Sequence, residues 1–309
     1  MNSEIIIHEV GPRDGLQMEK ALVPVEVKVR WIGGLIDAGV DIIQVGSFVH
    51  PTKVPQMAAT DELMKHFLAP GMKPDRVLLS ALVLNEKGLE RGLASGAEML
   101  CMGVSASETH SRKNTGMSIA EATGRIIAIA KDALAAKRRI QVSVQSAFGC
   151  GYEGEVPRER VMKIVERFLD AGLRNISLAD TAGHATPDRV EKMFSGILEF
   201  DEGVECACHF HNTYGLGLAN SYAALKVGVK YFESSVAGLG GCPFTKIAGG
   251  NVCTEDLVHM LQRMDVRHDI KLENLIEVAN DVSRFFDREM PGTIYKVGAI
   301  PEQVSVQGN

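Results

Sequence analysis

Short apolar runs alternate with longer stretches of helical periodicity along most of the chain. The runs lie at residues 5–7, 41–45, 77–83, 98–104, 140–144, 175–178, 204–210 and 231–235. Each is predicted to be a strand, because short runs rich in β-branched residues and bounded by turn residues are typical of strands buried on both faces.

Apolar residues at spacings of three and four follow most of these runs, and they predict helices. We expect helices over about 24–38, 86–95, 118–137, 157–171, from 187 onward, 218–227 and 254–264. Pro157 begins one helix and Gly172 ends it, which matches the usual preferences for helix ends. Eight strand–helix repeats within about 265 residues predict an α/β protein with a (β/α)8 (TIM) barrel.

A doubly wound sheet is the alternative architecture. It normally carries a glycine-rich GxGxxG turn after the first strand, whereas this turn reads Gly11-Pro12-Arg13-Asp14-Gly15. We expect a single domain over 1–309, in which 268–309 is a C-terminal extension. The extension should contain a helix over about 271–288, a break at Pro291-Gly292 and a loose end.

The charge balance and the hydrophobic pattern exclude several classes of protein. Thirty-three Lys and Arg against 39 Asp and Glu give a formal net charge of −6, which argues against nucleic-acid binding. No apolar run is long enough for a membrane span, and the first residues lack the pattern of a signal peptide. We therefore expect a cytoplasmic protein without membrane association, in which the six dispersed cysteines stay reduced.

Polar residues gather directly after the predicted strands, where the active sites of such barrels lie. They are Arg13, Asp14, Gln44, Ser47, His50, Gln145, Ser146, Asp180, Thr181, His209, His211 and Asn212, followed by the glycine-rich segment 238–251.

His209 and His211 are two positions apart, so both imidazoles should face the same side of a strand. Two imidazoles with carboxylate and amide oxygens suit Mg²⁺, Mn²⁺ or Zn²⁺. Asp14 is the natural carboxylate, because its strand should close the barrel beside the eighth strand, and Asn251 could supply the amide. A hydrogen-bonded histidine pair without metal is the alternative.

Other candidate residues have more than one interpretation. Arg13 is either a cation for developing negative charge or part of a structural ion pair. Asp180 could orient a ligand histidine, hold Arg13 or cap the following turn. Cys242, in a glycine-rich loop, is either a group that transfers a proton or a buried, inert thiol. The other cysteines are assigned to packing, and solvent exposure is expected for the loop histidines His50, His110 and His184.

Six motifs together resemble the hydroxymethylglutaryl-CoA lyase family. They are GPRDGLQ (11–17), SFVHP (47–51), VPQM (54–57), GCGYEG (149–154), SSVAGLGGCP (234–243) and TEDL (254–257). The family belongs to the metal-dependent lyases and Claisen-condensing enzymes built on (β/α)8 barrels. The resemblance extends from about Ile5 to Arg288.

The resemblance implies a retro-Claisen cleavage of a 3-hydroxyacyl-CoA into acetyl-CoA and a keto acid. Its implied metal ligands are Asp14, His209, His211 and Asn251, with Mg²⁺ or Mn²⁺ as the expected ion. It also implies that Arg13 stabilises the enolate and that Cys242 transfers a proton, with Asp180 and His209 in the catalytic network. Substrate contacts are expected from Arg13, Gln17, Gln44, Ser47 and Asn212. By analogy with similar barrels, we expect a homodimer.

Two positions depart from the family pattern. Gln44 replaces a glutamate and Asn212 replaces an aspartate, so two negative charges near the metal are missing. The two threonines that usually follow the glutamate are here Val45-Gly46, which leaves more room. A larger 3-hydroxyacyl-CoA than hydroxymethylglutaryl-CoA, or a related hydroxy acid, is therefore expected. Lys20, Lys53 and Lys113 are either contacts for CoA phosphates or solvated lysines. The competing functions are a CoA-independent hydroxy-acid aldolase, a condensing enzyme and a metal-binding protein without turnover.

Overall fold

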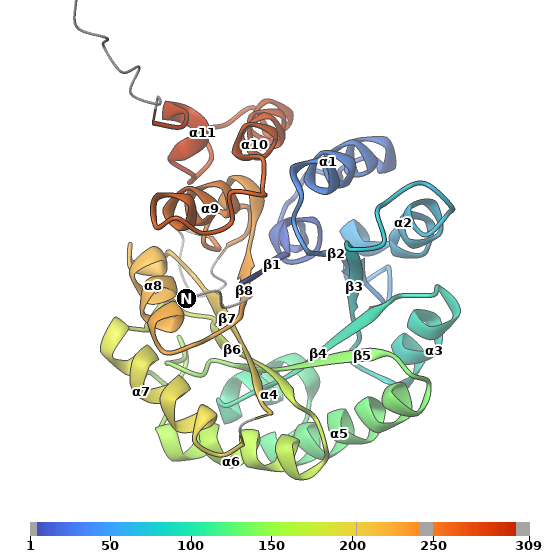
Figure 1. Cartoon of the computed structure of the whole chain (residues 1–309). Coiled ribbons are helices and arrows are strands. Elements are labelled where there is room, and N and C mark those ends of the chain that lie inside the picture. The colour runs from blue at the N-terminus through green and yellow to red at the C-terminus, as the bar shows by residue number, and fades with distance from the viewer. Residues whose placement is uncertain (1–4, 202, 242–249, 301–309) are drawn as a thin grey trace, which may run out of the picture.

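Eight parallel strands form a closed barrel in the computed structural model, which describes residues 5–201, 203–241 and 250–300. Each strand pairs with the next along the chain, and β8 pairs with β1 (Figure 1). The predicted (β/α)8 barrel is thereby confirmed. The strands are β1 (Ile6–Glu9), β2 (Ile42–Ser47), β3 (Leu78–Leu82), β4 (Met99–Ser105), β5 (Arg139–Gln145), β6 (Asn175–Asp180), β7 (Glu205–Phe210) and β8 (Tyr231–Ser234).

Helices surround the strands (Figure 1). The predicted ones are present as α1 (Val25–Ala38), α3 (Glu86–Ala94), α5 (Ile119–Ala135), α6 (Arg158–Asp170), α7 (Pro187–Leu198), α8 (Gly217–Lys226), α9 (Thr254–Arg263) and α10 (Leu272–Phe286). The sequence did not predict three further helices, α2 (Thr60–Phe67), α4 (Glu108–Thr115) and α11 (Ile294–Val297). Each has eight residues or fewer, which is too short for a clear helical period.

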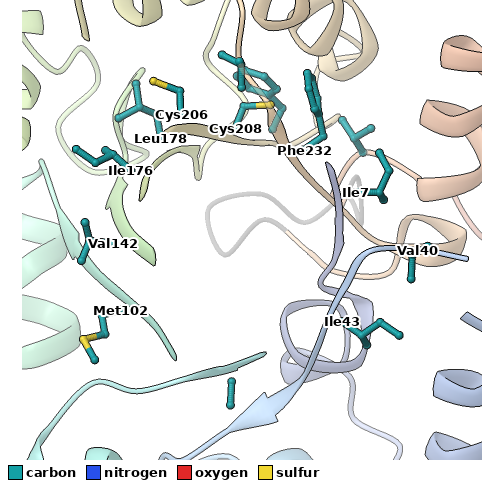
Figure 2. Packing of buried hydrophobic residues seen from close by; sticks show 14 of the residues in the cluster. Ile7, Val40, Ile43, Met102, Val142, Ile176, Leu178, Cys206, Cys208 and Phe232 are labelled. Carbon is teal, nitrogen blue, oxygen red and sulfur yellow. The ribbon is translucent and has the colours of Figure 1, made fainter. Parts of the chain in front are cut away.

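The main core lies between the outside of the barrel and the helices. Outward-facing side chains such as Val142, Ile176, Cys206 and Cys208 are buried there (Figure 2). Because side chains alternate along a strand, Cys206 and Cys208 face away from His209, as expected. The two cysteines are therefore packing residues.

The inside of the barrel is divided into an apolar and a polar part. Ile42, Met99, Ala207 and Tyr231, near the amino ends of their strands, form a separate apolar cluster. Two residues closer to the carboxyl ends of the strands, the next inward-facing side chains are polar. They are His8, Gln44, Ser80, Gln141, Ser177 and Glu233. A barrel interior of this kind places polar groups directly beneath its carboxyl-terminal mouth.

The C-terminal extension packs against the barrel. Helix α10 lies between α1 and α9 (Figure 1), and Trp31 of α1 donates a 2.7 Å hydrogen bond to the Asp281 carboxylate. The expectation of a loose end after residue 288 is wrong for residues 290–297. The backbone N–H groups of Thr293 and Ile294 donate to Asp256 of α9, and Met290 is buried. In the described part of the chain, every helix is too short or too polar to cross a bilayer.

Candidate metal-binding and catalytic site

A tight turn after β1 carries Arg13 and Asp14. It is a short π-type helix, η1 (Gly11–Gly15), in which three successive N–H groups, from Arg13 to Gly15, approach the carbonyl oxygen of Val10 at 2.7–3.3 Å. A Cβ atom on Gly15 would lie 2.7 Å from the Leu239 side chain, so glycine is required for this approach. The turn is thereby seated against the segment that follows β8, as the barrel closure predicted.

Three potential metal ligands converge at the mouth of the barrel. The ligand atoms of Asp14, His209 and His211 all lie within 4.8 Å of one another. Asn251 joins them, because its amide donates a 2.9 Å hydrogen bond to Asp14 and it forms a β-bridge with His211. The four residues predicted from the sequence as metal ligands are therefore neighbours.

The chemistry of this cluster fits a divalent cation. His211 Nδ1 and Asn251 Oδ1 are buried and have no hydrogen-bond partner among the described residues. Burial lowers the pKa of His211 to about 4, which keeps its imidazole neutral and able to coordinate. Burial alone would raise the pKa of Asp14, but Arg13 and the two histidines hold it well below its usual range. The cluster thus offers a carboxylate, neutral imidazole nitrogen and an amide oxygen.

Glu233 is a site residue that sequence reasoning missed. It lies opposite His209 in the register between β7 and β8, and its Oε2 is 3.0 Å from His209 Nδ1. Its other oxygen accepts a 2.8 Å hydrogen bond from Ser177. A glutamate inside the otherwise buried segment 231–234 was the available signal. Its carboxylate can fix the orientation of the His209 ring.

Arg13 connects the proposed ligands to β2. Its Nε donates to Gln44 Oε1, and its guanidinium also donates to Asp14 Oδ1 at 2.5 Å. Gln17 donates to the same Asp14 oxygen at 3.0 Å. Arg13 forms an ion pair with Asp14 and also lines the cavity described next. The two roles considered for it, a structural ion pair and a cation facing the substrate, are therefore compatible.

A cavity of about 370 Å³ opens above the polar part of the barrel. Six of the predicted site residues line it: Arg13, Asp14, Gln17, Gln44, His209 and His211. Its opposite wall includes Gln141, Ser143, Gln145, Asn114 and Tyr152.

Four described residues of the predicted site do not line this cavity: Asn251, whose contacts are given above, and Asp180, Asn212 and Ser47. Asp180 accepts hydrogen bonds from the N–H groups of His184 and Ala185, at 2.8 and 3.0 Å, and burial raises its pKa to about 6. Of the three roles predicted for Asp180, these contacts match the cap of the following turn. The carboxylate that contacts His209 is that of Glu233. Asn212 accepts from Gly217 N–H at the start of α8. Ser47 is bound through its backbone to Thr60.

Other expectations have mixed outcomes. Cys242 lies outside the described residues. His110 was expected in solvent, but it is buried and lines the cavity, because Ser105 and Asn114 flank its ring nitrogens at 2.9 and 2.7 Å. His50 is exposed, as expected, as are Lys20, Lys53 and Lys113.

Comparisons with known proteins agree with this geometry. The family model described as HMGL-like matches residues 4–282. The chain belongs to this family. Among HMGL-like relatives, a hydroxymethylglutaryl-CoA lyase of Bacillus subtilis is 37% identical over 93% of this chain and 95% of its own length. The human mitochondrial hydroxymethylglutaryl-CoA lyase is 39% identical, with 92% and 86% covered.

A solved HMGL-like structure extends the comparison to bound ligands. An HMG-CoA lyase from Acinetobacter baumannii, in complex with coenzyme A and 3-methylmalate, superposes with a TM-score of 0.89. It is 34% identical, and 98% of each chain is covered. The barrel described above is therefore that of an HMGL-like protein over nearly its whole length.

Proposed function

We propose that the protein is a divalent-metal-dependent carbon–carbon lyase. Its substrate would be a 3-hydroxyacyl-CoA similar to 3-hydroxy-3-methylglutaryl-CoA, and its products acetyl-CoA and a keto acid. The observation that carries the proposal is the cluster of Asp14, His209, His211 and Asn251 in a chain of the HMGL-like family. The first three of these residues line one cavity together with Arg13.

Asp14, His209, His211 and Asn251 would hold the metal ion, with Mg²⁺ or Mn²⁺ preferred. When bound, the ion would lower the pKa of the substrate hydroxyl and polarise the carbonyl that forms from it. Glu233 accepts a hydrogen bond from His209 Nδ1–H in this arrangement, which leaves Nε2 as the ligand nitrogen.

Arg13 would stabilise the negative charge of the reaction. The 3-hydroxyl loses its proton, the C2–C3 bond breaks, and its electron pair moves onto the thioester half as an enolate. The Arg13 guanidinium is a fixed cation at the cavity wall and would interact with the enolate oxygen. Protonation of the enolate carbon then gives acetyl-CoA, and Cys242 is our proposed proton donor.

The coenzyme would approach across the rim of the cavity. Lys113 contacts a residue of the cavity wall, because its Nζ lies 4.0 Å from the ring centroid of Tyr152. Because Tyr152 lines the cavity, we propose Lys113, rather than Lys20 or Lys53, as a contact for a CoA phosphate. The relative that is bound to coenzyme A supports a thioester substrate. A cytoplasmic homodimer remains our prediction for the whole protein.

Release of acetyl-CoA tests the proposal directly. Purified protein is supplied with Mg²⁺ or Mn²⁺ and offered hydroxymethylglutaryl-CoA beside larger 3-hydroxyacyl-CoA analogues, with EDTA as the control. We expect cleavage that EDTA abolishes and added metal restores. Metal-loaded protein that cleaves none of these thioesters would favour the CoA-independent aldolase or the non-catalytic metal-binding protein instead.

A further inference from the structure

Strand β5 forms an uncharged polar wall of the cavity. Gln141, Ser143 and Gln145 occupy alternate positions and all line the cavity, whereas Val142 and Val144 belong to the outer core. Figure 2 shows Val142 on the outer side of the strand. The wall faces the same space as the metal-ligand cluster but belongs to the opposite side of the barrel.

Space along this wall is provided by the neighbouring strand. Cys101 and Gly103 of β4 pair with Gln141 and Ser143. A Cβ atom on Gly103 would lie 3.3 Å from Gln145 Nε2 and 3.5 Å from Ser143 Cβ. The absence of a side chain at Gly103 therefore keeps the polar groups of β5 in contact with the cavity.

Gln141 carries an unused hydrogen-bond donor at this wall. The side chain is 2% exposed, and its Nε2 has no partner among the described residues. A buried amide that has lost its water costs free energy unless an acceptor replaces it. No described group accepts from this donor, and Gln141 lines the cavity, so a ligand in the cavity can supply the acceptor.

The charges around the cavity restrict this acceptor. Arg13 already donates to Asp14 and Gln44, and the other described side chains of the β5 wall are neutral. Glu233 adds a buried carboxylate that contacts His209. A ligand carboxylate at the β5 wall would find no cation there to balance its charge, so its burial would be unfavourable. A neutral oxygen, from a hydroxyl or a carbonyl group, fits this environment.

We propose that Gln141 forms a specificity subsite for the acyl group, which rests on the proposed lyase function. The subsite selects 3-hydroxyacyl thioesters whose branch at C3 carries a neutral oxygen, in preference to the same branch made of carbon alone. Gln141 Nε2 donates to that oxygen. Ser143 lines the space that the branch enters.

Isosteric ligand pairs test this subsite. The ligands are glutaryl-CoA derivatives without the 3-hydroxyl group, which cannot be cleaved. In the first pair the C3 substituent is –CH2OH or ethyl, and in the second pair it is 2-hydroxyethyl or propyl. Dissociation constants are measured by calorimetry for the Mg²⁺-loaded wild type, Gln141→Met and the control Gln145→Met. Cleavage rates are measured for the corresponding 3-hydroxy compounds and for hydroxymethylglutaryl-CoA.

We expect the wild type to bind the oxygen member of at least one pair about tenfold more tightly, as one retained hydrogen bond allows. Gln141→Met should reduce this ratio to about one, and Gln145→Met should keep it. Without ligand, the Tm of Gln141→Met should equal or exceed that of the wild type, because the variant removes an unpaired donor.

The possible failures can be distinguished. Equal binding within both pairs, with normal cleavage of hydroxymethylglutaryl-CoA, would overturn the subsite and leave the lyase function standing. Selective binding without cleavage of any thioester would support the subsite and overturn the lyase function. A fall of several degrees in the Tm of Gln141→Met would make Gln141 a structural residue and overturn the subsite.

Discussion

His209 is held between two carboxylates. Glu233 Oε2 lies 3.0 Å from its Nδ1, and Asp14 Oδ2 lies 3.8 Å from its Nε2. The contact with Glu233 restricts the imidazole to one orientation, in which Nε2 points toward the other proposed ligands. A single substitution at this residue should therefore affect the whole proposed metal site.

We expect His209→Ala to lose both metal and cleavage. Removing one of four ligands, and the only described contact between Glu233 and the cluster, should lower Mn²⁺ affinity by a factor of at least about 100. Bound Mn²⁺ is measured by atomic absorption after gel filtration, with the exposed His50→Ala as the control. Full metal content and activity in His209→Ala would overturn the assigned ligand set.

Gln44→Glu should raise the cleavage of hydroxymethylglutaryl-CoA. The substitution keeps the size of the side chain and turns its contact with Arg13 into an ion pair between two charged groups. It also restores the negative charge that the resemblance to hydroxymethylglutaryl-CoA lyases implies at this position. The comparison is kcat/KM for wild type, Gln44→Glu and Gln145→Glu, another glutamine of the cavity. An unchanged value in Gln44→Glu would show that pocket shape, rather than charge, limits the reaction.

The sequence identified the members of the proposed ligand cluster better than the residues that support them. Asp14, His209 and His211 were identifiable because each lies at or just after the end of a strand and has a metal-binding side chain. Glu233 was missed because its importance depends on the register between β7 and β8, which no local pattern records. Asp180 is the converse case, since an acidic residue after a strand can cap a turn as well as serve a reaction.

Two buried glutamates support the backbone after β8, where the first and last strand–helix units meet. Glu9 of β1 accepts hydrogen bonds from Val236 N–H and from the Thr254 hydroxyl, at 3.0 and 2.5 Å. Glu255 of α9 accepts from Ala237 N–H at 3.0 Å. Ala237 has the left-handed φ of 59°, so these bonds stabilise a strained backbone after β8. Burial raises the pKa of Glu9 to about 7 and that of Glu255 to about 8.

This junction predicts a stability that falls as the pH rises. Between the ordinary glutamate pKa of 4.5 and about 8, the folded state retains a proton on Glu255 that the unfolded state has lost. The free energy of unfolding therefore decreases across that range. Glu255→Gln should remove part of the decrease, so its Tm should gain on the wild type between pH 6 and 9. The exposed Glu90→Gln serves as the control, and parallel Tm curves for Glu255→Gln and wild type would contradict this assignment.

Element lengths explain which parts of the fold were predictable. The strands were found because buried parallel strands are continuous apolar runs. Helices α2 and α4 were missed because eight residues give only two helical turns, and η1 was missed because its geometry depends on contacts with the segment after β8. The order of strands and helices was sufficient to predict the barrel. The geometry of the turns could be seen only in the tertiary structure.

The C-terminal extension fills the outer helical layer between the first and the last strand–helix units. Helix α10 packs against α1 so closely that a Cβ atom on Gly34 would lie 2.5 Å from Val278 Cγ2. The adjacent Gly33 has nothing within 4 Å of the corresponding position. These two neighbours in one helix therefore form a matched pair for testing the docking.

We expect Gly34→Ala to destabilise the protein by about 1–3 kcal/mol, because the stiff Val278 side chain must shift. Gly33→Ala should instead be stabilising by about 0.5–1 kcal/mol, since alanine is the better helix former. Both values follow from urea unfolding monitored by the fluorescence of Trp31, which packs against Phe285 at 5.5 Å. Equal effects of the two substitutions would show that α10 does not press on α1 at this point.

Closure of the barrel also sets the order of events during synthesis. Strand β1 needs β8 as its second neighbour, and about 220 residues separate them. At about 5–20 residues per second, a ribosome takes roughly 10–45 s to supply that partner. During this interval one edge of β1 lacks its final partner and is open to wrong pairings. The nascent chain therefore gains its complete barrel only after β8 has been synthesised, and slower translation would lengthen the period in which it needs protection from aggregation.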